Sequence, residues 1–513
     1  MPIRSIWGGL SAAIVLVLAS GVPASAETPE ADASETKMEV AEPVMFVTEH
    51  VGRFGGERVN YRVEAGEVFL KNEKGEPTAS IFAFSYIKQD ADETRPVTFV
   101  FNGGPGSASI WLHMGMFGPK RVLVASDADE DDGAAPYTLI DHPDSPLDVT
   151  DLVFIDPVGT GYSRVIGAGD STDYWSQSGD TQSVAEFIRL WIDEHDRWNA
   201  PKYLAGESFG TMRAVQVAHE LTTSRANNIA LNGLALISNA LDYEGSTPVH
   251  DNFYSYVTYL PTMAATSHYF ERAGQGVPLQ TFIDEARTFA RDEYAPALLK
   301  GAAMTAEERA YIIERMAYFT GLDAAYIDRS DLRILTGRYR KELLRDQGVA
   351  IGSLDSRYFV DEADDVAERP RLDAASTAFG AAYTAMFNHY INTTLGVDIE
   401  RPYKVSNGEV GSNWNYRTAP EGQSWEPSYV NVARKLSTAM RHNKDLDVWV
   451  ANGLYDLVTP FFDADMTFAR HGIPFDRVAL TYYEAGHMMY VHEPSRVAIM
   501  RDLRAFYAGA LNK

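Results

Sequence analysis

The chain of 513 residues contains no cysteine. This excludes disulfides, thiolate nucleophiles, zinc ribbons and thiolate-bound iron–sulfur clusters. Basic residues are also scarce, with 45 Lys and Arg against 71 Asp and Glu and a formal net charge of −26. An acidic chain is repelled by phosphate backbones and anionic bilayers, so we expect no nucleic-acid partner. With 45% hydrophobic residues, the chain is still apolar and long enough for one large enzyme domain with an insertion.

Long apolar runs are missing except near the N-terminus. There Arg4 precedes an apolar run at residues 6–19, and the small residues Ala-Ser-Ala follow at 24–26. This order predicts a secretory signal peptide over residues 1–26, because the run is shorter than the roughly 20 residues of a membrane span. We therefore expect an exported protein, periplasmic or secreted, without a membrane span after cleavage; an uncleaved anchor is the alternative. Residues 27–43 are polar and are predicted to form a disordered linker.

The rest of the chain has the pattern of an α/β core interrupted by an insertion. Short alternating runs at its start predict antiparallel strands joined by tight turns. Further on, continuous apolar strands such as 96–101 and 152–155 alternate with amphipathic helices, which predicts a doubly wound, mostly parallel sheet covered on both faces. We assign residues 44–240 and 426–513 to this core. Residues 241–425 lose the strand rhythm and are predicted to form a mostly helical cap over a cleft.

The pentapeptide GESFG, residues 206–210, fits the pattern G-x-S-x-G between a strand and a helix. Such a turn holds a nucleophilic serine, here Ser208, in a strained conformation, and its glycines allow the close approach of neighbouring backbone. The N–H of Phe209 is then directed at a developing oxyanion. Alone, this pattern also fits a turn with a surface serine. The strand before it and the helix after it favour the nucleophile.

A serine nucleophile needs a base that is oriented by an acid. In this kind of fold the acid and then the histidine follow the serine along the chain. Asp456 follows a predicted strand at 447–451, and His487 follows the next strand. Catalytic groups of open α/β sheets gather at such strand ends, so we predict a triad of Ser208, Asp456 and His487. The rivals lie at or within predicted helices: His492, Asp463 and Asp465.

A second glycine-rich turn, NGGPG at residues 102–106, follows a buried strand where another oxyanion donor is expected. Glycines at this point let backbone N–H groups converge on an oxygen atom without obstruction by side chains. By itself the motif is only a turn. Together with the elbow, the acid and the histidine in the right order, it predicts a hydrolase site.

These residues resemble one family, the serine carboxypeptidases of the α/β-hydrolase fold. Five blocks match in order: FNGGPGSAS (101–109), DLVFIDPVGTGYS (151–163), YLAGESFG (203–210), NGLYDLVTP (452–460) and EAGHMM (484–489). They span the core but neither the N-terminal strands nor the cap. Ser107 stands where the family usually has cysteine, so the chain resembles a disulfide-free, bacterial-type branch.

The resemblance implies an enzyme that releases C-terminal residues from peptides through an acyl-enzyme on Ser208. His487 would act as general base and then acid, Asp456 would hold its tautomer, and the N–H groups of Gly104 and Phe209 would form the oxyanion hole. The residues implied to hold the terminal carboxylate of the substrate are Asn102, Gly103 and Glu207. Peptides are the expected partners.

Neither a metal nor a cofactor is expected. The acidic run at residues 127–132 resembles a calcium loop, but Asp132 stands where such a loop needs glycine. Thr138 likewise stands where the loop needs a bidentate acid. We interpret the run as a solvated loop.

One departure from the family concerns the reaction itself. The family commonly has Glu-Leu-Gly-Pro after NGGPG, and that glutamate shares a proton with the one before the nucleophile. This chain has Met116 in its place, so Glu207 would act alone and would need to be protonated to accept a carboxylate. We therefore expect a weakened or shifted acid preference. The alternative function is an esterase, amidase or acyltransferase of the same fold with a relaxed need for a free carboxylate. The intact triad disfavours a non-enzymatic binding protein.

Overall fold

The computed structural model describes residues 40–511 except 127, 129, 131, 132, 225–227, 418, 420–424 and 426–428. The predicted signal peptide (residues 1–26) and residues 27–39 of the predicted linker lie outside this part. Residues 40–44 form neither helix nor strand. In the part of the chain that is described, no helix has both the length and the hydrophobicity needed to cross a bilayer.

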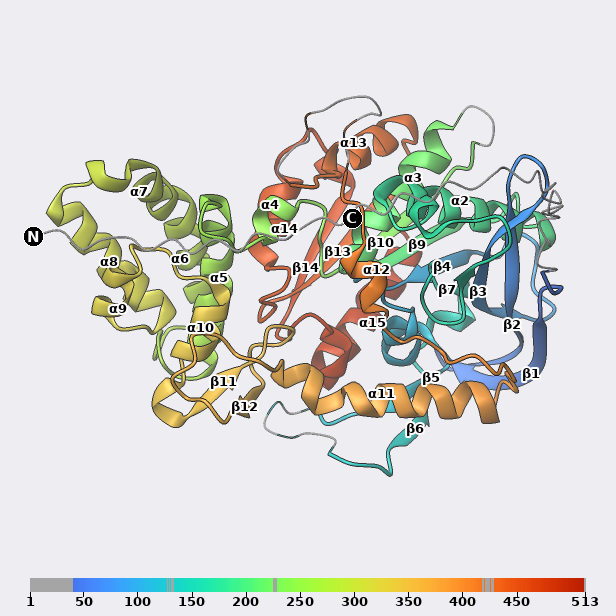
Figure 1. Ribbon diagram of the computed structural model, residues 1–513, viewed down its shortest axis with the longest axis horizontal. Helices are drawn as coiled ribbons and strands as arrows, with labels where there is room; N and C mark the ends of the chain where they lie inside the picture. Colours follow the sequence, from blue (N-terminus) through green and yellow to red (C-terminus); the bar gives the residue numbers. More distant parts are fainter. Residues whose placement is uncertain are drawn as a thin grey trace, which may run out of the picture. The chain divides into compact units, whose positions relative to one another are not determined.

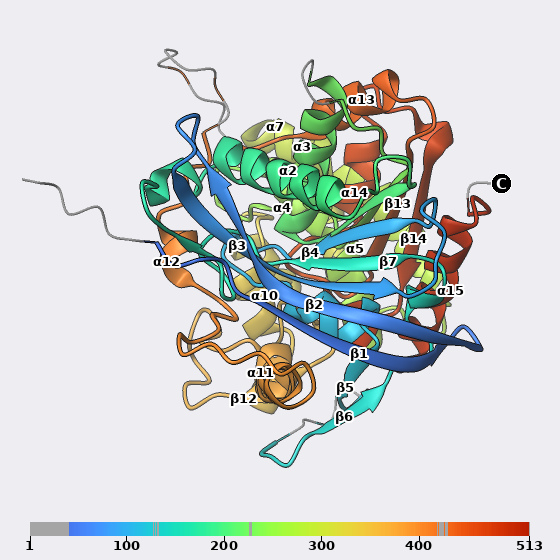
Figure 2. The ribbon, with the colours of Figure 1, turned by 90° about the vertical axis from the view of Figure 1, so that its right-hand side faces the viewer.

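A sheet of ten strands, counted over the described residues, forms the centre of the molecule (Figures 1 and 2). Its order is β1-β2-β3-β7-β4-β9-β10-β13-β14, and β8 pairs with β3. The strands of this sheet are β1 (Met45–Phe54), β2 (Glu57–Lys71), β3 (Pro77–Lys88), β4 (Val97–Phe101), β7 (Asp151–Ile155), β8 (Arg164–Val165), β9 (Lys202–Glu207), β10 (Gly233–Ile237), β13 (Asp447–Gly453) and β14 (Val478–Tyr483).

The pairing changes direction once along the sheet. β1 pairs antiparallel with β2, β2 with β3, and β3 with β7. From β7 to β14 all neighbours are parallel. β4, β7 and β10 are buried along their whole length, which explains their continuous apolar sequences. The predicted fold class, an α/β-hydrolase with N-terminal antiparallel strands, is confirmed.

Helices cover both faces of the sheet, and alternate residues of each strand face opposite sides. In β10, Leu234 and Leu236 pack with α2, α3 and α13, whereas Ala235 and Ile237 pack with α1, α11 and α15. The helices are α1 (Ile110–Leu112), α2 (Gln177–Glu194), α3 (Phe209–Thr223), α4 (Tyr243–Ser246), α5 (Phe253–Tyr269), α6 (Leu279–Phe289), α7 (Ala295–Lys300), α8 (Ala306–Thr320), α9 (Ala324–Arg329), α10 (Thr336–Glu342), α11 (Ala374–Thr393), α12 (Gly408–Ser412), α13 (Ala433–His442), α14 (Phe461–Phe468) and α15 (Glu493–Tyr507).

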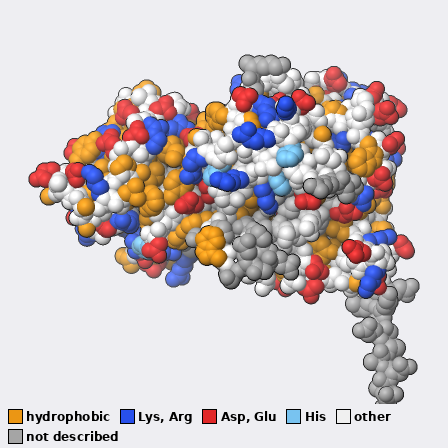
Figure 3. Space-filling view, turned by 90° about the horizontal axis from the view of Figure 1, so that it is seen from above, with side chains coloured by type: hydrophobic (Ala, Val, Ile, Leu, Met, Phe, Trp, Pro, Cys, Tyr) orange, Lys and Arg blue, Asp and Glu red, His pale blue; other side chains and the backbone are white. Residues whose placement is uncertain are grey.

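Two parts of the segment between β10 and β13 pack in different places. α5 to α10 share a hydrophobic cluster with the start of α14 and lie beside the sheet, on the left in Figure 1. They expose Leu299, Tyr311 and Tyr318, and hydrophobic side chains gather on this part of the surface in Figure 3. α11 instead packs against the sheet itself. The core boundary predicted at residue 426 lies outside the described residues.

Two short hairpins were not predicted from the sequence. One pairs β5 (Lys120–Leu123) with β6 (Thr138–Asp141), and the other pairs β11 (Val349–Ile351) with β12 (Phe359–Asp361). The second precedes α11 and lies inside the mainly helical segment.

Candidate active site

Ser208 occupies a strained turn between β9 and α3. Its backbone has φ 60° and ψ −129°, a conformation that residues with a side chain rarely adopt. A Cβ atom on Gly206 would lie 2.1 Å from the carbonyl oxygen of Gly210, and one on Gly210 would lie 2.8 Å from that of Phe101. Both positions therefore require glycine. The N–H of Ser208 donates to the carbonyl of Ile237 at 2.9 Å, which attaches the turn to β10.

The predicted acid and base are hydrogen-bonded to each other. Nδ1 of His487 lies 2.7 Å from Oδ2 of Asp456, which is fully buried. Oδ1 of Asp456 accepts the N–H groups of Val458 and Thr459, and the hydroxyl of Thr459 donates to Oδ2 at 2.7 Å. The aspartate is thus held on both oxygens. With Nδ1 facing Asp456, Nε2 is the ring nitrogen left to act on a reacting group.

The charge around His487 favours its protonated form. Burial is the largest influence and lowers its pKa, but the negative charges of Asp456 and Glu207 and the hydrogen bond to Asp456 outweigh it. The pKa of His487 is therefore raised above its ordinary value of 6.5. A base with a raised pKa needs a higher pH to be free of its proton.

The NGGPG turn lies directly against the elbow. A Cβ atom on Gly103 would be 2.5 Å from the backbone nitrogen of Phe209. The first N–H groups of a helix have no partner within it. Among the described residues, neither the N–H of Gly104 nor that of Phe209 makes a hydrogen bond. Both predicted oxyanion donors are therefore available to a ligand.

A single cleft of about 220 Å³ brings these groups together. Its polar lining includes all the predicted residues except the buried Asp456 and the backbone donor of Phe209: Asn102, Gly103, Gly104, Glu207, Ser208 and His487. The remaining lining comes from Ser107, Trp111, Leu354, Ser376, Phe379, Gly380 and Met488. The nucleophile, the base and the predicted carboxylate-binding residues thus open onto one space. The rival residues Asp463, Asp465 and His492 do not line this cleft.

Glu207 is buried and carries an unusual pKa. Its Oε2 accepts hydrogen bonds from Nδ2 of Asn102 and from the hydroxyl of Tyr490, each at 2.8 Å. Burial, the largest influence, raises the pKa of Glu207 from 4.5 to about 7. The positive charge of His487 and the two hydrogen bonds lower it in part, and Asp456 raises it. In mildly acidic solution this side chain is therefore neutral.

The family of this chain follows from its sequence as a whole. The profile of the family described as serine carboxypeptidase matches residues 56–474, which is most of the chain. The protein belongs to the serine carboxypeptidase family. The predicted resemblance is confirmed.

Curated members of the family in Arabidopsis thaliana are distant relatives. Serine carboxypeptidase-like 16 is 27% identical over 177 residues, covering 33% of this chain and 39% of the relative. Serine carboxypeptidase-like 3 is 27% identical over 183 residues, covering 35% of this chain and 38% of the relative. The alignments thus span about two fifths of the length of these relatives.

Solved structures of other proteins align with most of the length of the chain. Proline iminopeptidase from Mycobacterium smegmatis is 14% identical, with 90% of this chain and all of that chain covered and a TM-score of 0.34. A putative aryl esterase from Burkholderia cenocepacia is 13% identical, with 87% of this chain and all of that chain covered and a TM-score of 0.37.

Three supporting features of this family member were not found from its sequence. Arg213 of α3 donates to the carbonyl oxygen of Asn102, stacks over the ring of Phe209 at 5.3 Å and pairs with buried Asp180 at 2.7 Å. It therefore ties the NGGPG turn to the elbow. Nothing in the local sequence distinguishes this arginine from others on a helix.

The second feature is the loop between β11 and β12, residues 353–357. The N–H of Leu457 donates to the carbonyl of Ser353, and the N–H of His487 donates to that of Leu354. Oδ2 of Asp355 accepts the N–H of Gly486 at 2.9 Å. The loop thus holds both the acid segment and the histidine segment, although it lies more than 100 residues before them in the chain.

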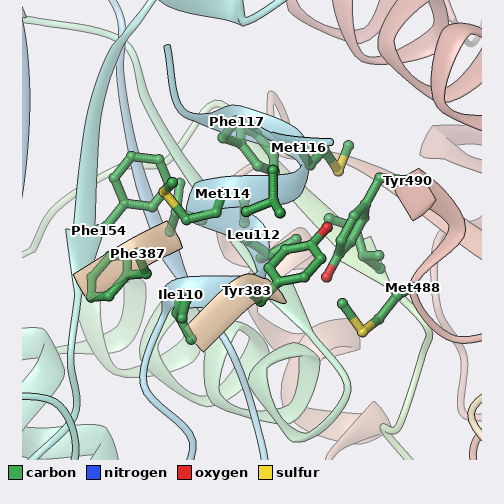
Figure 4. Packing of buried hydrophobic residues seen from close by; sticks show 14 of the residues in the cluster. Ile110, Leu112, Met114, Met116, Phe117, Phe154, Tyr383, Phe387, Met488 and Tyr490 are labelled. Atoms are coloured by element: carbon green, nitrogen blue, oxygen red, sulfur yellow. The ribbon is translucent and has the colours of Figure 1, made fainter. Parts of the chain in front are cut away.

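The third feature is Tyr490, and it corrects an expectation about Glu207. The sequence predicted that Met116 leaves Glu207 without a partner. Met116 is indeed fully buried in a hydrophobic cluster (Figure 4), but Glu207 is not alone, because the Tyr490 hydroxyl reaches it from the segment after the histidine. No motif signals this contact, since 283 positions separate the two residues.

Proposed function

We propose that this protein is an exported serine-type carboxypeptidase that removes C-terminal residues from peptides. Ser208 is the nucleophile, His487 the base and then the acid, and Asp456 the group that orients the histidine. The observation that carries the proposal is the shared cleft. This cleft is lined by Ser208 and His487 and also by Asn102, Gly103 and Glu207.

In the proposed reaction, the Ser208 hydroxyl attacks the last peptide carbonyl while Nε2 of His487 takes its proton. The N–H groups of Gly104 and Phe209 stabilise the oxyanion of the tetrahedral intermediate. His487 then gives its proton to the departing amine, which leaves as the free C-terminal residue. Water, deprotonated by His487, hydrolyses the acyl-enzyme and restores the serine.

Recognition of the C-terminus rests on a neutral Glu207. Asn102 supports this role, because its Oδ1 accepts the N–H of Leu112 at 3.1 Å and so directs Nδ2 toward Glu207 and the cleft. A protonated carboxyl can donate a hydrogen bond to the substrate carboxylate, whereas an ionised one repels it. Since the pKa of Glu207 is about 7, we expect tight binding of free-acid peptides only below that pH.

The other walls of the cleft favour apolar residues in the substrate. They are formed by Trp111 of α1, Leu354, Phe379 of α11 and Met488. Among the described residues that line the cleft, Glu207 and His487 are the only ones that titrate, and both have catalytic or binding roles. A charged peptide side chain would lose its hydration here without gaining a partner. We therefore propose peptides with apolar residues at the cleaved bond as the substrates.

The test compares an N-blocked dipeptide of two apolar residues with its C-terminal amide from pH 4 to 8. Release of the last residue from the free acid only, abolished in Ser208→Ala, is the expected result. Equal cleavage of acid and amide would favour the esterase or amidase alternative. No turnover of either, with Ser208 still labelled by a fluorophosphonate, would reject the substrate class but keep the nucleophile.

Export rests on residues 1–26 alone and needs its own test. Sequencing the N-terminus of protein recovered from the periplasm or the medium should find Glu27 first. Protein that starts at Met1 and stays with the membrane fraction would show an uncleaved anchor.

A further inference from the structure

Tyr490 lies behind the cleft rather than in it. It is fully buried, and its ring stands in a hydrophobic cluster with Met116, Tyr383 and Met488 (Figure 4). The cleft is lined by Glu207 but not by Tyr490. Its hydroxyl can therefore act on a substrate through the carboxyl group of Glu207, which it contacts.

The position of the Tyr490 ring is tightly determined. It sits in a short 3-10 turn, Met489–Val491, that links the histidine segment to α15. A Cβ atom on Gly115 would lie 2.4 Å from two ring carbons of Tyr490, so the ring fills a slot above a residue without a side chain. The Oη atom is thereby fixed 2.8 Å from Oε2 of Glu207.

The two donors on Glu207 determine which of its oxygens can carry a proton. Both the Asn102 amide and the Tyr490 hydroxyl approach Oε2. Among the described residues, none donates to Oε1. An oxygen that already accepts two hydrogen bonds is a poor site for a proton, so the neutral carboxyl carries its proton on Oε1. Because Glu207 lines the cleft, this leaves the Oε1–H group as its donor for a ligand.

Tyr490 differs from a second carboxyl group in one chemical respect. Burial raises its pKa well above the ordinary value, and the charge of Glu207 raises it further. The hydroxyl therefore keeps its proton throughout the pH range in which Glu207 titrates. A tyrosine can orient Glu207 without sharing a titrating proton with it.

We propose that Tyr490 is the positioning residue of the carboxylate-binding site, where its hydroxyl fixes the Glu207 proton on Oε1, toward the C-terminal carboxylate of a peptide substrate. This inference rests on the proposed carboxypeptidase function. In place of the two carboxyl groups expected from the family, the site then has one titrating acid, Glu207. Two hydrogen-bond donors that do not titrate, Asn102 and Tyr490, hold this acid. Binding of the substrate carboxylate then depends on a single ionisation in the binding site, that of Glu207.

The pH dependence of KM follows from the groups around Glu207. These are His487 and Asp456 from the segments after β14 and β13, Asn102 after β4, and Tyr490. Glu207 is the group among them whose ionisation places a negative charge beside the substrate carboxylate. For free-acid peptides, KM should rise tenfold per pH unit above about pH 7, as for one ionisation. A coupled pair of acids would give two steps.

The decisive variant is Tyr490→Phe, which removes only the hydroxyl. The loss of one hydrogen bond should raise KM for the free-acid dipeptide about three- to tenfold at pH 5, with kcat little changed. Because the hydroxyl stabilises the ionised form of Glu207, its removal should also move the midpoint of the KM profile to higher pH. Hydrolysis of an ester substrate without a free carboxylate should not change.

Tyr390→Phe is the matched control. Tyr390 is a buried tyrosine in the same cluster, but its hydroxyl contacts that of Tyr86 at 3.2 Å rather than Glu207. It should leave both KM and its pH profile unchanged. In a double variant, Glu207→Gln with Tyr490→Phe, the pH profile of KM should have no midpoint, because the titrating group is gone.

Three outcomes separate this inference from the function on which it rests. If the unmodified enzyme does not release the last residue of a free-acid dipeptide, the proposed function fails first. If it does, but Tyr490→Phe has the same KM and pH midpoint as the Tyr390→Phe control, Tyr490 is only a packing residue. If Tyr490→Phe does not fold, inhibition of the unmodified enzyme by an N-blocked amino acid decides: two carboxyl ionisations in its pH profile, in addition to that of His487, would overturn the proposal.

Discussion

Replacing Glu207 with glutamine should change how the stability of the protein depends on pH. The carboxyl has an ordinary pKa of 4.5, which applies to the unfolded chain, and a pKa of about 7 in the fold. Between these values the folded protein binds more protons than the unfolded chain, so stability falls as the pH rises. The difference between these two pKa values corresponds to about 3 kcal/mol of stabilisation, and all of this stabilisation is lost above pH 7. This is a large share of the roughly 5–15 kcal/mol that holds most domains together.

Glutamine reproduces the neutral acid. Its carbonyl oxygen can accept from Asn102 and Tyr490, and its amide can donate where the Glu207 proton does. At pH 4.5 the variant should therefore match the wild type, and at pH 8 it should be more stable by up to about 3 kcal/mol. Urea unfolding at both pH values, followed by far-ultraviolet circular dichroism, measures the difference. Burial also raises the pKa of Asp156 to about 7. Because Asp156 is present in both proteins, its contribution to the pH dependence of stability cancels in the comparison.

A substitution at an exposed glutamate provides the control. Glu409→Gln on α12 should give the same small difference from wild type at pH 4.5 and at pH 8, because Glu409 is exposed. Glu207→Gln could likewise differ from the wild type by the same free energy of unfolding at both pH values. In that case Glu207 is ionised in the folded protein at mildly acidic pH. That result would refute the account of carboxylate binding given above.

Three further predictions concern the triad and the elbow. Asp456→Asn should lower kcat about 10⁴-fold with little change in KM, because the amide favours the wrong tautomer of His487; steady-state kinetics with an ester substrate measures it. Gly206→Ala should destabilise the protein by about 3 kcal/mol, since its Cβ would lie 2.1 Å from the Gly210 carbonyl oxygen; a melting temperature equal to that of the wild type would contradict the elbow geometry. For free-acid peptides kcat/KM should rise as His487 loses its proton and fall above about pH 7 as Glu207 ionises, whereas an ester should show only the rising limb.

Much of the fold was predictable because its signals are local. The apolar sequences of β4 and β7 and the amphipathic pattern of α2 reflect burial within one element. The GESFG turn could be identified because its glycines are required by contacts within five residues and with the adjoining strand. The short hairpins were missed, since β5 and β6 are four residues each and only partly buried.

The sequence by itself determined the fold class, the family and the candidate triad, because strand ends in a parallel sheet bring Ser208, Asp456 and His487 to one edge whatever the loops do. Only the tertiary structure decided what surrounds that triad. Tyr490 meets Glu207, and α11 brings Phe379 to the cleft, through packing between segments that are far apart in the chain. Such contacts depend on how helices dock and loops close, and no local pattern of residues encodes them.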